Sequence, residues 1–176
     1  GISQLRSSGF DSDYLDAQFQ NGSDGPMFEI EVLRWLLATI DGNPEGIKQV
    51  GNENGGTAYL NQEVQDYGDN KESYPWMFLS VNNRTADDYT QVTNLAKTFS
   101  LSGPAFDAQA SQVFDIDEWL RVMAYQQLVG PFDVSYTSVY VHNSRLYLRP
   151  EDRKVLYLPW DWDSVFGRLP GESIFG

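Results

Sequence analysis

Residues 154–167 read Lys154-Val155-Leu156-Tyr157-Leu158-Pro159-Trp160-Asp161-Trp162-Asp163-Ser164-Val165-Phe166-Gly167. The first six residues have the length and the branched and aromatic content of a short β-strand. This strand would deliver two tryptophans and two aspartates to the loop that follows it. If the chain stays extended there, side chains two positions apart share a face, so Asp161 and Asp163 point at one spot. Carboxylate oxygens are the ligands that Mg²⁺ prefers, which makes the two aspartates candidate metal ligands.

A simpler origin for this acidic pair stays open. The chain carries 25 acidic against 12 basic side chains, so acid-x-acid pairs arise from composition alone. Asp11 and Asp13 form a similar pair, and most such pairs lie in solvated loops. The neighbouring Trp160 and Trp162 favour the metal site, because carboxylates among aromatic rings are costly to leave without a partner.

Upstream of this stretch, residues 115–130 carry the clearest helix signals of the chain. Asp115 is placed as the N-cap with Glu118 three positions later, and Phe114 and Trp119 are spaced as a hydrophobic staple across the first turn. A Gly-Pro pair ends the helix. Its expected buried face consists of Ile116, Trp119, Leu120, Met123, Ala124 and Leu128.

A loop and a predicted hairpin connect this helix to the final strand. Asp133 follows the Gly-Pro pair, where an Asp is most often a cap or a turn residue but could also orient a hydroxyl nucleophile. Residues 139–142 and 145–148 alternate as two strands around a turn at Asn143-Ser144. Residues 150–153 predict a further turn before the last strand.

The first hundred residues carry weaker secondary-structure signals than the rest of the chain. Apolar and acidic side chains alternate over 28–32, which predicts a half-buried strand, and the apolar crowding over 33–40 favours a helix. Residues 51–56 form a glycine- and asparagine-rich loop without the spacing of a phosphate cradle. A capping box at 85–88 and an apolar stripe predict a helix that ends near residue 99.

Composition excludes several classes of protein. Of the 176 residues, 41% are hydrophobic and 14% aromatic, enough for a packed core, and none is cysteine. Thiol catalysis, cysteine zinc sites and disulfides are therefore excluded. The net charge of −13 argues against binding nucleic acid or an anionic membrane. No apolar run approaches the roughly 20 residues that span a bilayer, and the first residues do not form a targeting signal.

The order of these features resembles the CotH kinase family, atypical protein-kinase-like proteins named after a bacterial spore-coat component. The matching stretches are 115–120, 130–133, 139–141 and 158–167, with weaker similarity at 24–28 and 74–89. The Trp-Asp-Trp-Asp-x-x-Phe-Gly sequence is the most specific of them. The resemblance implies an α+β fold like the carboxy-terminal lobe of a protein kinase, with two main helices, a β-hairpin plus a third strand, and long loops.

The resemblance also implies roles for particular residues. Asp133 matches the catalytic-loop Asp that orients the acceptor hydroxyl, and Asp161 matches the metal-binding Asp, with Asp163 beside it. Ser138 stands where the family usually carries Asn as a second metal ligand, and a hydroxyl is a weaker ligand than an amide oxygen. The implied cofactors are Mg²⁺ and ATP, and the implied partner is a protein substrate with Ser or Thr hydroxyls.

The resemblance finally implies one partial domain, with residues 1–25 as a lobe linker and 26–176 as the carboxy-terminal lobe. The amino-terminal nucleotide lobe is expected to be absent, because none of Arg6, Lys48 and Lys71 lies in a strand-like context suited to gripping a nucleotide. The chain alone is therefore expected to be inactive, and the parent protein to be extracellular or part of a surface coat. Two alternatives stay open: a non-catalytic surface or coat binding module, and an extracellular Ca²⁺- or carbohydrate-binding domain.

Overall fold

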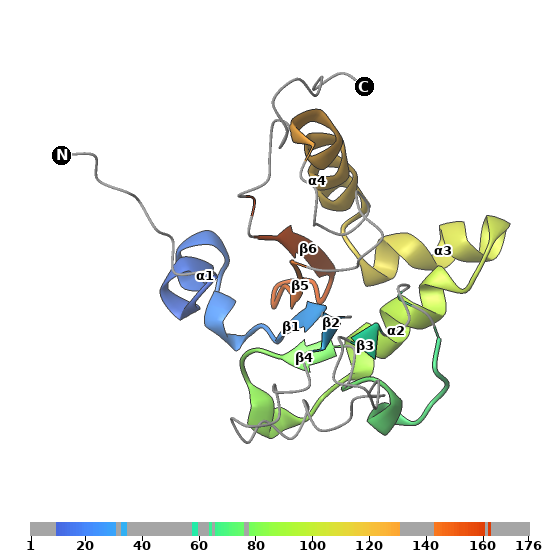
Figure 1. The fold of residues 1–176 in the computed structure, drawn as a ribbon, viewed down its shortest axis with the longest axis horizontal. Coiled ribbons are helices and arrows are strands. Elements are labelled where there is room, and N and C mark those ends of the chain that lie inside the picture. Colours follow the sequence, from blue (N-terminus) through green and yellow to red (C-terminus); the bar gives the residue numbers. More distant parts are fainter. Residues whose placement is uncertain are drawn as a thin grey trace.

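The computed structural model describes residues 10–30, 33–34, 58–59, 64, 66–75, 78–130, 143–160 and 162. Its strands are β1 (Met27–Ile30), β2 (Leu33–Arg34), β3 (Ala58–Tyr59), β4 (Phe78–Ser80), β5 (Ser144–Leu148) and β6 (Val155–Pro159). Its α-helices are α1 (Ser12–Gln18), α2 (Thr90–Phe99), α3 (Gly103–Val113) and α4 (Ile116–Val129). Its short 3₁₀ turns are η1 (Gly22–Asp24), η3 (Lys71–Ser73) and η4 (Arg84–Ala86). The predicted α+β class is confirmed (Figure 1).

Four strands form one antiparallel sheet in the order β4-β1-β5-β6. β1 is an inner strand, where Glu29 lies opposite Leu79 of β4 and opposite Arg145 of β5. β6 is an outer strand and pairs with β5. The remaining strands, β2 and β3, pair with each other in a separate two-stranded sheet. The pairing of β1 with β5 therefore joins the first part of the chain to the last described hairpin.

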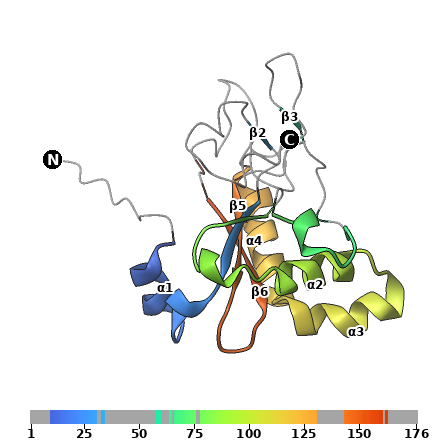
Figure 2. The same cartoon turned by 90° about the horizontal axis from the view of Figure 1, so that it is seen from below.

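Both faces of the four-stranded sheet are covered by helices, α1 on one side and α2 to α4 on the other (Figure 2). Phe28 and Ile30 of β1 join the larger core, which includes Leu95 of α2 and Trp119 of α4. The smaller core consists of Leu15, Met27, Tyr147 and Leu156. The strand predicted over 28–32 is confirmed for its described part, but it is covered on two faces rather than one.

A glycine allows the segment after α1 to lie directly against β5. A Cβ on Gly25 would come within 2.5 Å of both the Leu148 carbonyl oxygen and the Tyr147 ring. The Leu148 N–H donates to the carbonyl of Pro26 at 2.9 Å, and the Tyr147 hydroxyl donates to the carbonyl of Gly22 at 2.8 Å. These contacts fix α1 and its following turn onto the sheet.

α2 begins later than the capping box predicts. Thr85 lies in η4, and the N–H of Thr90 donates to Asp88 Oδ1 at 2.9 Å, so the predicted capping box is wrong. Asp88 instead makes the short-range bond to a backbone N–H two positions on that is typical of Asx turns. The predicted apolar stripe is confirmed by the burial of Tyr89, Val92 and Ala96.

α3 is a helix that the sequence patterns did not predict. Ser102 is the N-cap of α3, which begins with Gly103 at a φ of 57° and has Pro104 in its first turn. A proline in the first turn lacks only an N–H that has no partner within the helix. The two main helices of the prediction are thus α2 and α4, and the structure adds α3.

The first turn of α4 is capped as predicted. Asp115 Oδ1 accepts the N–H of Glu118 at 3.2 Å, and the rings of Phe114 and Trp119 lie 5.3 Å apart. Trp119 is 2% exposed, and its Nε1 donates to the carbonyl of Val155 at 3.0 Å. The N-cap, the staple and the burial of Trp119 are confirmed.

The rest of the buried face of α4 differs from the prediction. Three predicted positions are exposed: Leu120, Ala124 and Leu128. Val129 and the polar Gln126 are buried in their place, at 4% and 1% exposure. Gln126 tolerates burial because its Nε2 donates to the hydroxyl of Tyr157 at 3.2 Å. The helix is therefore rotated so that a polar bond to β6 replaces leucine packing.

β5 and β6 form the hairpin of the carboxy-terminal half. The turn predicted at Asn143-Ser144 is wrong at Ser144, which begins β5, and residues 139–142 lie outside the described residues. The turn predicted at 150–153 is confirmed and joins the two strands. Arg149 beside this turn forms an ion pair with Asp115 at 2.8 Å, which ties the hairpin to the cap of α4.

Two other predictions concern the first hundred residues. The helix predicted over 33–40 is wrong at its start, because Leu33–Arg34 forms β2, and residues 35–40 lie outside the described ones. The loop predicted over 51–56 lies outside them as well. Within the part of the chain that the structure describes, no helix combines the length and the apolar character needed to cross a membrane.

Candidate functional site

The predicted site residues are Asp133, Ser138, Asp161 and Asp163, and all four lie outside the described residues. The structure does describe the chain on either side of them. Gly130 caps α4 before the first of them, and Asn143 precedes β5. Trp160 and Trp162 lie on either side of Asp161 in the chain.

The flanks meet at one end of the β5–β6 hairpin, beside the carboxyl half of α4 (Figure 2). The N–H of Trp160 donates to the carbonyl of Asn143 at 2.9 Å, one step beyond β6. The ring of Trp162 stacks on Tyr125 of α4, with centroids 5.2 Å apart and planes inclined by 24°. Asn143 before β5 and Trp160 after β6 thus lie together at this end of the hairpin, and Trp162 lies against α4.

Trp160 lies against a charged pair that bridges two strands. Arg145 of β5 donates to Glu29 Oε2 of β1 through Nε at 3.2 Å and through Nη2 at 3.1 Å. The two side chains are mostly covered, with exposures of 14% and 23%. The guanidinium carbon of Arg145 lies 5.0 Å from the centre of the Trp160 ring, within the range of a cation–π contact.

The two tryptophans are held on opposite faces of the sheet. Arg145 lies two positions before Tyr147 of the smaller core, so Trp160 lies over the α1 face. Trp162 stacks on α4, which covers the other face. The extended course expected for Asp161 and Asp163 concerns residues that lie outside the described ones.

Three buried polar atoms at this end make no hydrogen bond within the described part of the chain: Gln126 Oε1, Trp160 Nε1 and Trp162 Nε1. Gln126 uses its amide nitrogen on the Tyr157 hydroxyl, which also contacts Ser144 Oγ at 3.0 Å. If the amide were turned over, its nitrogen would lose that acceptor instead, so one end of the amide lacks a partner either way. Such groups cost free energy when they are buried without a partner.

Glu118 lies at the other end of α4, where its side chain accepts a hydrogen bond from the outer strand of the sheet. Its Oε2 accepts the N–H of Tyr157 at 3.0 Å, so the outer edge of β6 is covered by a side chain of the helix. Burial raises the pKa of Glu118 to about 7, against the opposing effect of the Tyr157 hydrogen bond. The group titrates near neutral pH, yet its contacts are with the backbone of β6 and not with the predicted site.

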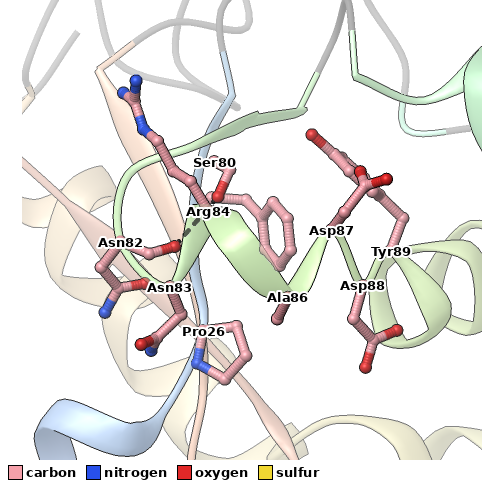
Figure 3. A pocket seen from close by; sticks show the side chains of 10 residues that line it. Pro26, Ser80, Asn82, Asn83, Arg84, Ala86, Asp87, Asp88 and Tyr89 are labelled. Carbon is pink, nitrogen blue, oxygen red and sulfur yellow. Dashed lines mark hydrogen bonds between the residues drawn. The ribbon is translucent and has the colours of Figure 1, made fainter.

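Two hollows of the described surface lie on other elements. The smaller, of about 30 Å³, is lined by Pro26, Phe28 and eight residues in and around η4: Ser80, Asn82, Asn83, Arg84, Ala86, Asp87, Asp88 and Tyr89 (Figure 3). It has room for water but not for a nucleotide. The larger, of about 310 Å³, is an open depression between η3 and the start of α2. Its walls include the surface ion pairs of Lys71 with Asp87 and of Lys97 with Asp69. No residue of α4, β5 or β6 lines either hollow.

A family model described as CotH kinase protein matches residues 9–173. The chain belongs to the CotH kinase family. The match covers nearly the whole chain and confirms both the resemblance and the kinase-like class of the fold. Comparison with curated proteins and with solved structures gave no match.

The metal implied by the CotH family would depend on residues beyond the described set. Among the described residues no three His, Asp or Glu side chains gather in a group that could hold a metal ion. Glu29, the carboxylate nearest in the strands to Trp160, is engaged by Arg145. The carboxylates of Asp161 and Asp163 with the hydroxyl of Ser138 are hard oxygen donors, and this chemistry fits Mg²⁺.

Several residues that shape this end of the CotH chain were not singled out from the sequence. In the sequence pattern, Glu29 is one of the polar positions of an alternating strand, and Arg145 belongs to a predicted hairpin strand. Their pairing follows from the register of β1 on β5, which no local pattern encodes. Gln126 and Tyr125 sit on a helix whose phase was assigned from its leucines. A buried glutamine opposite a strand tyrosine becomes visible only when α4 is placed on β6.

Proposed function

We propose that this CotH chain belongs to a protein kinase that transfers the γ-phosphate of ATP to Ser or Thr hydroxyls of a protein. Family membership supports a kinase-like function. The observation that supports the proposal is the contact of Asn143 with Trp160 at one end of the β5–β6 hairpin, because these residues flank the segments that contain Asp133 and Asp161. A kinase site requires this proximity, because one carboxylate orients the acceptor hydroxyl while another holds the metal.

Each candidate residue has a distinct task in this proposal. Asp133 would accept a hydrogen bond from the acceptor hydroxyl and take its proton as the bond to phosphorus forms. Asp161 and Asp163 would hold Mg²⁺, and Ser138 would add a weaker hydroxyl ligand. When bound, Mg²⁺ supplies charge neutralisation of the phosphate oxygens. The protein's share of the chemistry is positioning, so the residues around Asp161 matter as much as the carboxylate itself.

The cation site is tested first, with the metal alone. Mn²⁺, a substitute for Mg²⁺, is titrated into the chain while tryptophan fluorescence is recorded, because Trp160 and Trp162 adjoin Asp161. We expect a saturable change that Asp161→Asn removes. Asp107→Asn, which alters an exposed acid on α3, is the matched control and should leave the titration unchanged. Equal binding by the Asp161 variant and the unaltered chain would contradict the metal site.

Phosphoryl transfer is then followed with γ-labelled ATP and a protein that exposes Ser and Thr. In the full-length protein, Asp161→Asn should abolish transfer with the fold intact, and Asp133→Asn should slow transfer while Mg·ATP binding largely remains. Full activity of both variants would overturn the assignment. Calcium-dependent glycan binding without ATP binding would instead support an extracellular carbohydrate-binding domain, and the absence of both would support a non-catalytic module.

A further inference from the structure

We propose that the outward face of α4 is a docking surface for a second copy of this chain, whose own α4 lies antiparallel against it. The face is formed by Leu120, Ala124 and Leu128, which follow one another at every fourth position and are all exposed. We call these three residues the α4 stripe. The inference concerns assembly and goes beyond the proposed phosphoryl transfer, on which it does not depend.

The α4 stripe points directly away from the core. Successive side chains of a helix are rotated by about 100°, which places Ala124 opposite the buried side of α4. That buried side includes Trp119, Gln126 and Val129. Leu120 and Leu128 are 61% and 66% exposed, more than any other large hydrophobic side chain among the described residues. Large apolar side chains gathered on one exposed face are typical of an interaction surface.

The charge pattern of α4 suits contact between two copies of this chain. Because each copy carries a net charge of −13, most contacts between them bring like charges together. Beside the α4 stripe, Asp117 and Arg121 form an ion pair with each other at 2.7 Å. Residues 122–130 contain no acidic or basic side chain. Two copies can therefore meet through the α4 stripe without bringing unpaired charges together.

The α4 stripe reads the same in both directions along the helix. The larger Leu120 and Leu128 lie four positions before and four positions after the small Ala124. A dimer with two-fold symmetry needs a surface that complements itself. With the axis at Ala124, Leu120 of each copy packs against Leu128 of the other, and the two alanines let the helices approach closely. The antiparallel pair therefore buries the leucines of both copies.

The ion pair at the amino end of α4 distinguishes the antiparallel from the parallel arrangement. Asp117 precedes Ala124 by seven positions. In the antiparallel pair the two Asp117 side chains lie roughly 20 Å apart along the helices, beyond the screening length of about 8 Å in physiological salt. In a parallel pair they lie side by side, at the roughly 8–10 Å that separates packed helices, and so do the two Arg121 side chains. The helix dipoles also oppose each other only in the antiparallel pair.

The size of the face limits the strength of the pair. From Leu120 to Leu128 the α4 stripe spans about 12 Å of helix. It therefore supplies only part of the roughly 1,200–2,000 Å² that stable interfaces bury. We expect a reversible dimer with a dissociation constant between about 1 μM and 1 mM. High salt should strengthen this dimer, because screening reduces the repulsion between two copies of net charge −13.

Engineered cysteines test the arrangement, because the chain has no cysteine of its own. Ala124→Cys, Leu120→Cys and Leu128→Cys are oxidised with copper phenanthroline, alone and in mixtures, and resolved on a non-reducing gel. A disulfide forms readily only where two Cα atoms come within about 7 Å. Ala124→Cys should link to itself, whereas Leu120→Cys and Leu128→Cys should link to each other when mixed and only weakly alone. Leu101→Cys, at an exposed position outside α4, is the control and should not link.

Sedimentation equilibrium then measures the affinity, at protein concentrations from about 10 μM to 1 mM and at about 0.1 M and 1 M NaCl. Leu128→Ser removes two leucines from each dimer, and at about tenfold for each the dissociation constant should rise roughly a hundredfold. Leu101→Ser, which alters another exposed leucine, should leave the dissociation constant unchanged. Far-UV circular dichroism checks that both variants remain folded.

Four results would overturn the proposal. The first is a monomer at every concentration, and the second is a dimer that Leu128→Ser leaves intact. The third is a dimer that high salt dissociates, because this would point to attraction between charged surfaces and not to the α4 stripe. The fourth is strong linking of Leu120→Cys alone and of Leu128→Cys alone, which would show a parallel pair.

Discussion

At the scale of single residues, Glu118 is the side chain whose titration should affect stability most near neutral pH. Its pKa is raised by burial from an ordinary 4.5 to about 7, so the folded protein holds this proton more tightly than the unfolded chain. The contribution of Glu118 to the free energy of unfolding should therefore be fully present below pH 4.5 and be lost as the pH rises from about 4.5 to 7. The Asp115 and Asp152 carboxyls have lowered pKa values, so their contribution changes at more acidic pH.

Glu118→Gln tests this assignment, because an amide oxygen can still accept the Tyr157 N–H but cannot ionise. We expect the unaltered chain to lose about 2 kcal/mol of stability between pH 5 and pH 8, after allowance for partial solvent screening, and the variant to lose much less. Urea unfolding at several pH values measures the difference. Parallel curves for the two proteins would show that Glu118 is not the titrating group. Other ionisable groups cancel in this comparison because both proteins carry them.

At the scale of elements, α4 shows what the amino-acid pattern could and could not predict. Its boundaries followed from local signals, the Asp115 cap and the terminal Gly-Pro, and both agree with the structure. Its rotation about the axis did not, because Leu120 and Leu128 are exposed and Gln126 is buried. The burial of a glutamine depends on a hydroxyl from β6, which is a tertiary contact.

In the sheet and the candidate site, too, local features could be predicted from the sequence and tertiary contacts could not. The strands at 28–30 and 155–159 and the turn between β5 and β6 could be predicted, because alternation and turn residues are local. The Arg145–Glu29 contact required the register of strands that are distant in the chain. The aspartates of the site were named from their motif, and the structure adds how their flanks are held rather than where their carboxylates lie.

The neighbouring residues Leu128 and Val129 give a direct test of the observed helix phase. Leu128 is 66% exposed and Val129 is 4% exposed. Leu128→Ala should therefore change the free energy of unfolding by less than about 0.5 kcal/mol, and Val129→Ala should lower it by about 2 kcal/mol. Trp119→Ala, at the other end of the same buried face, should cost about 3–5 kcal/mol. Urea denaturation of the three variants measures these changes. A larger loss of stability in Leu128→Ala than in Val129→Ala would mean that Leu128, and not Val129, faces the core.

At the scale of the whole molecule, the sheet lies between two cores of unequal size. The smaller core has four buried members, yet all three of its strands, β1, β5 and β6, also carry residues of the larger core. Met27 and Phe28 are adjacent in the chain and point into different cores. Because the two cores share a backbone, they should unfold together and not in separate steps.

Leu15→Ala tests this coupling, since Leu15 is 1% exposed and is the residue through which α1 enters the smaller core. Removing its side chain should lower the free energy of unfolding of the entire domain by about 2–5 kcal/mol. Amide hydrogen exchange reports this directly: protection in α4, on the opposite face of the sheet, should fall together with protection in α1. Leu101→Ala, at a position 41% exposed, is the matched control and should leave both unchanged. If α1 were an independently attached helix, Leu15→Ala would lower protection in α1 alone, and α4 would exchange as slowly as before because its contacts with β6 would be intact.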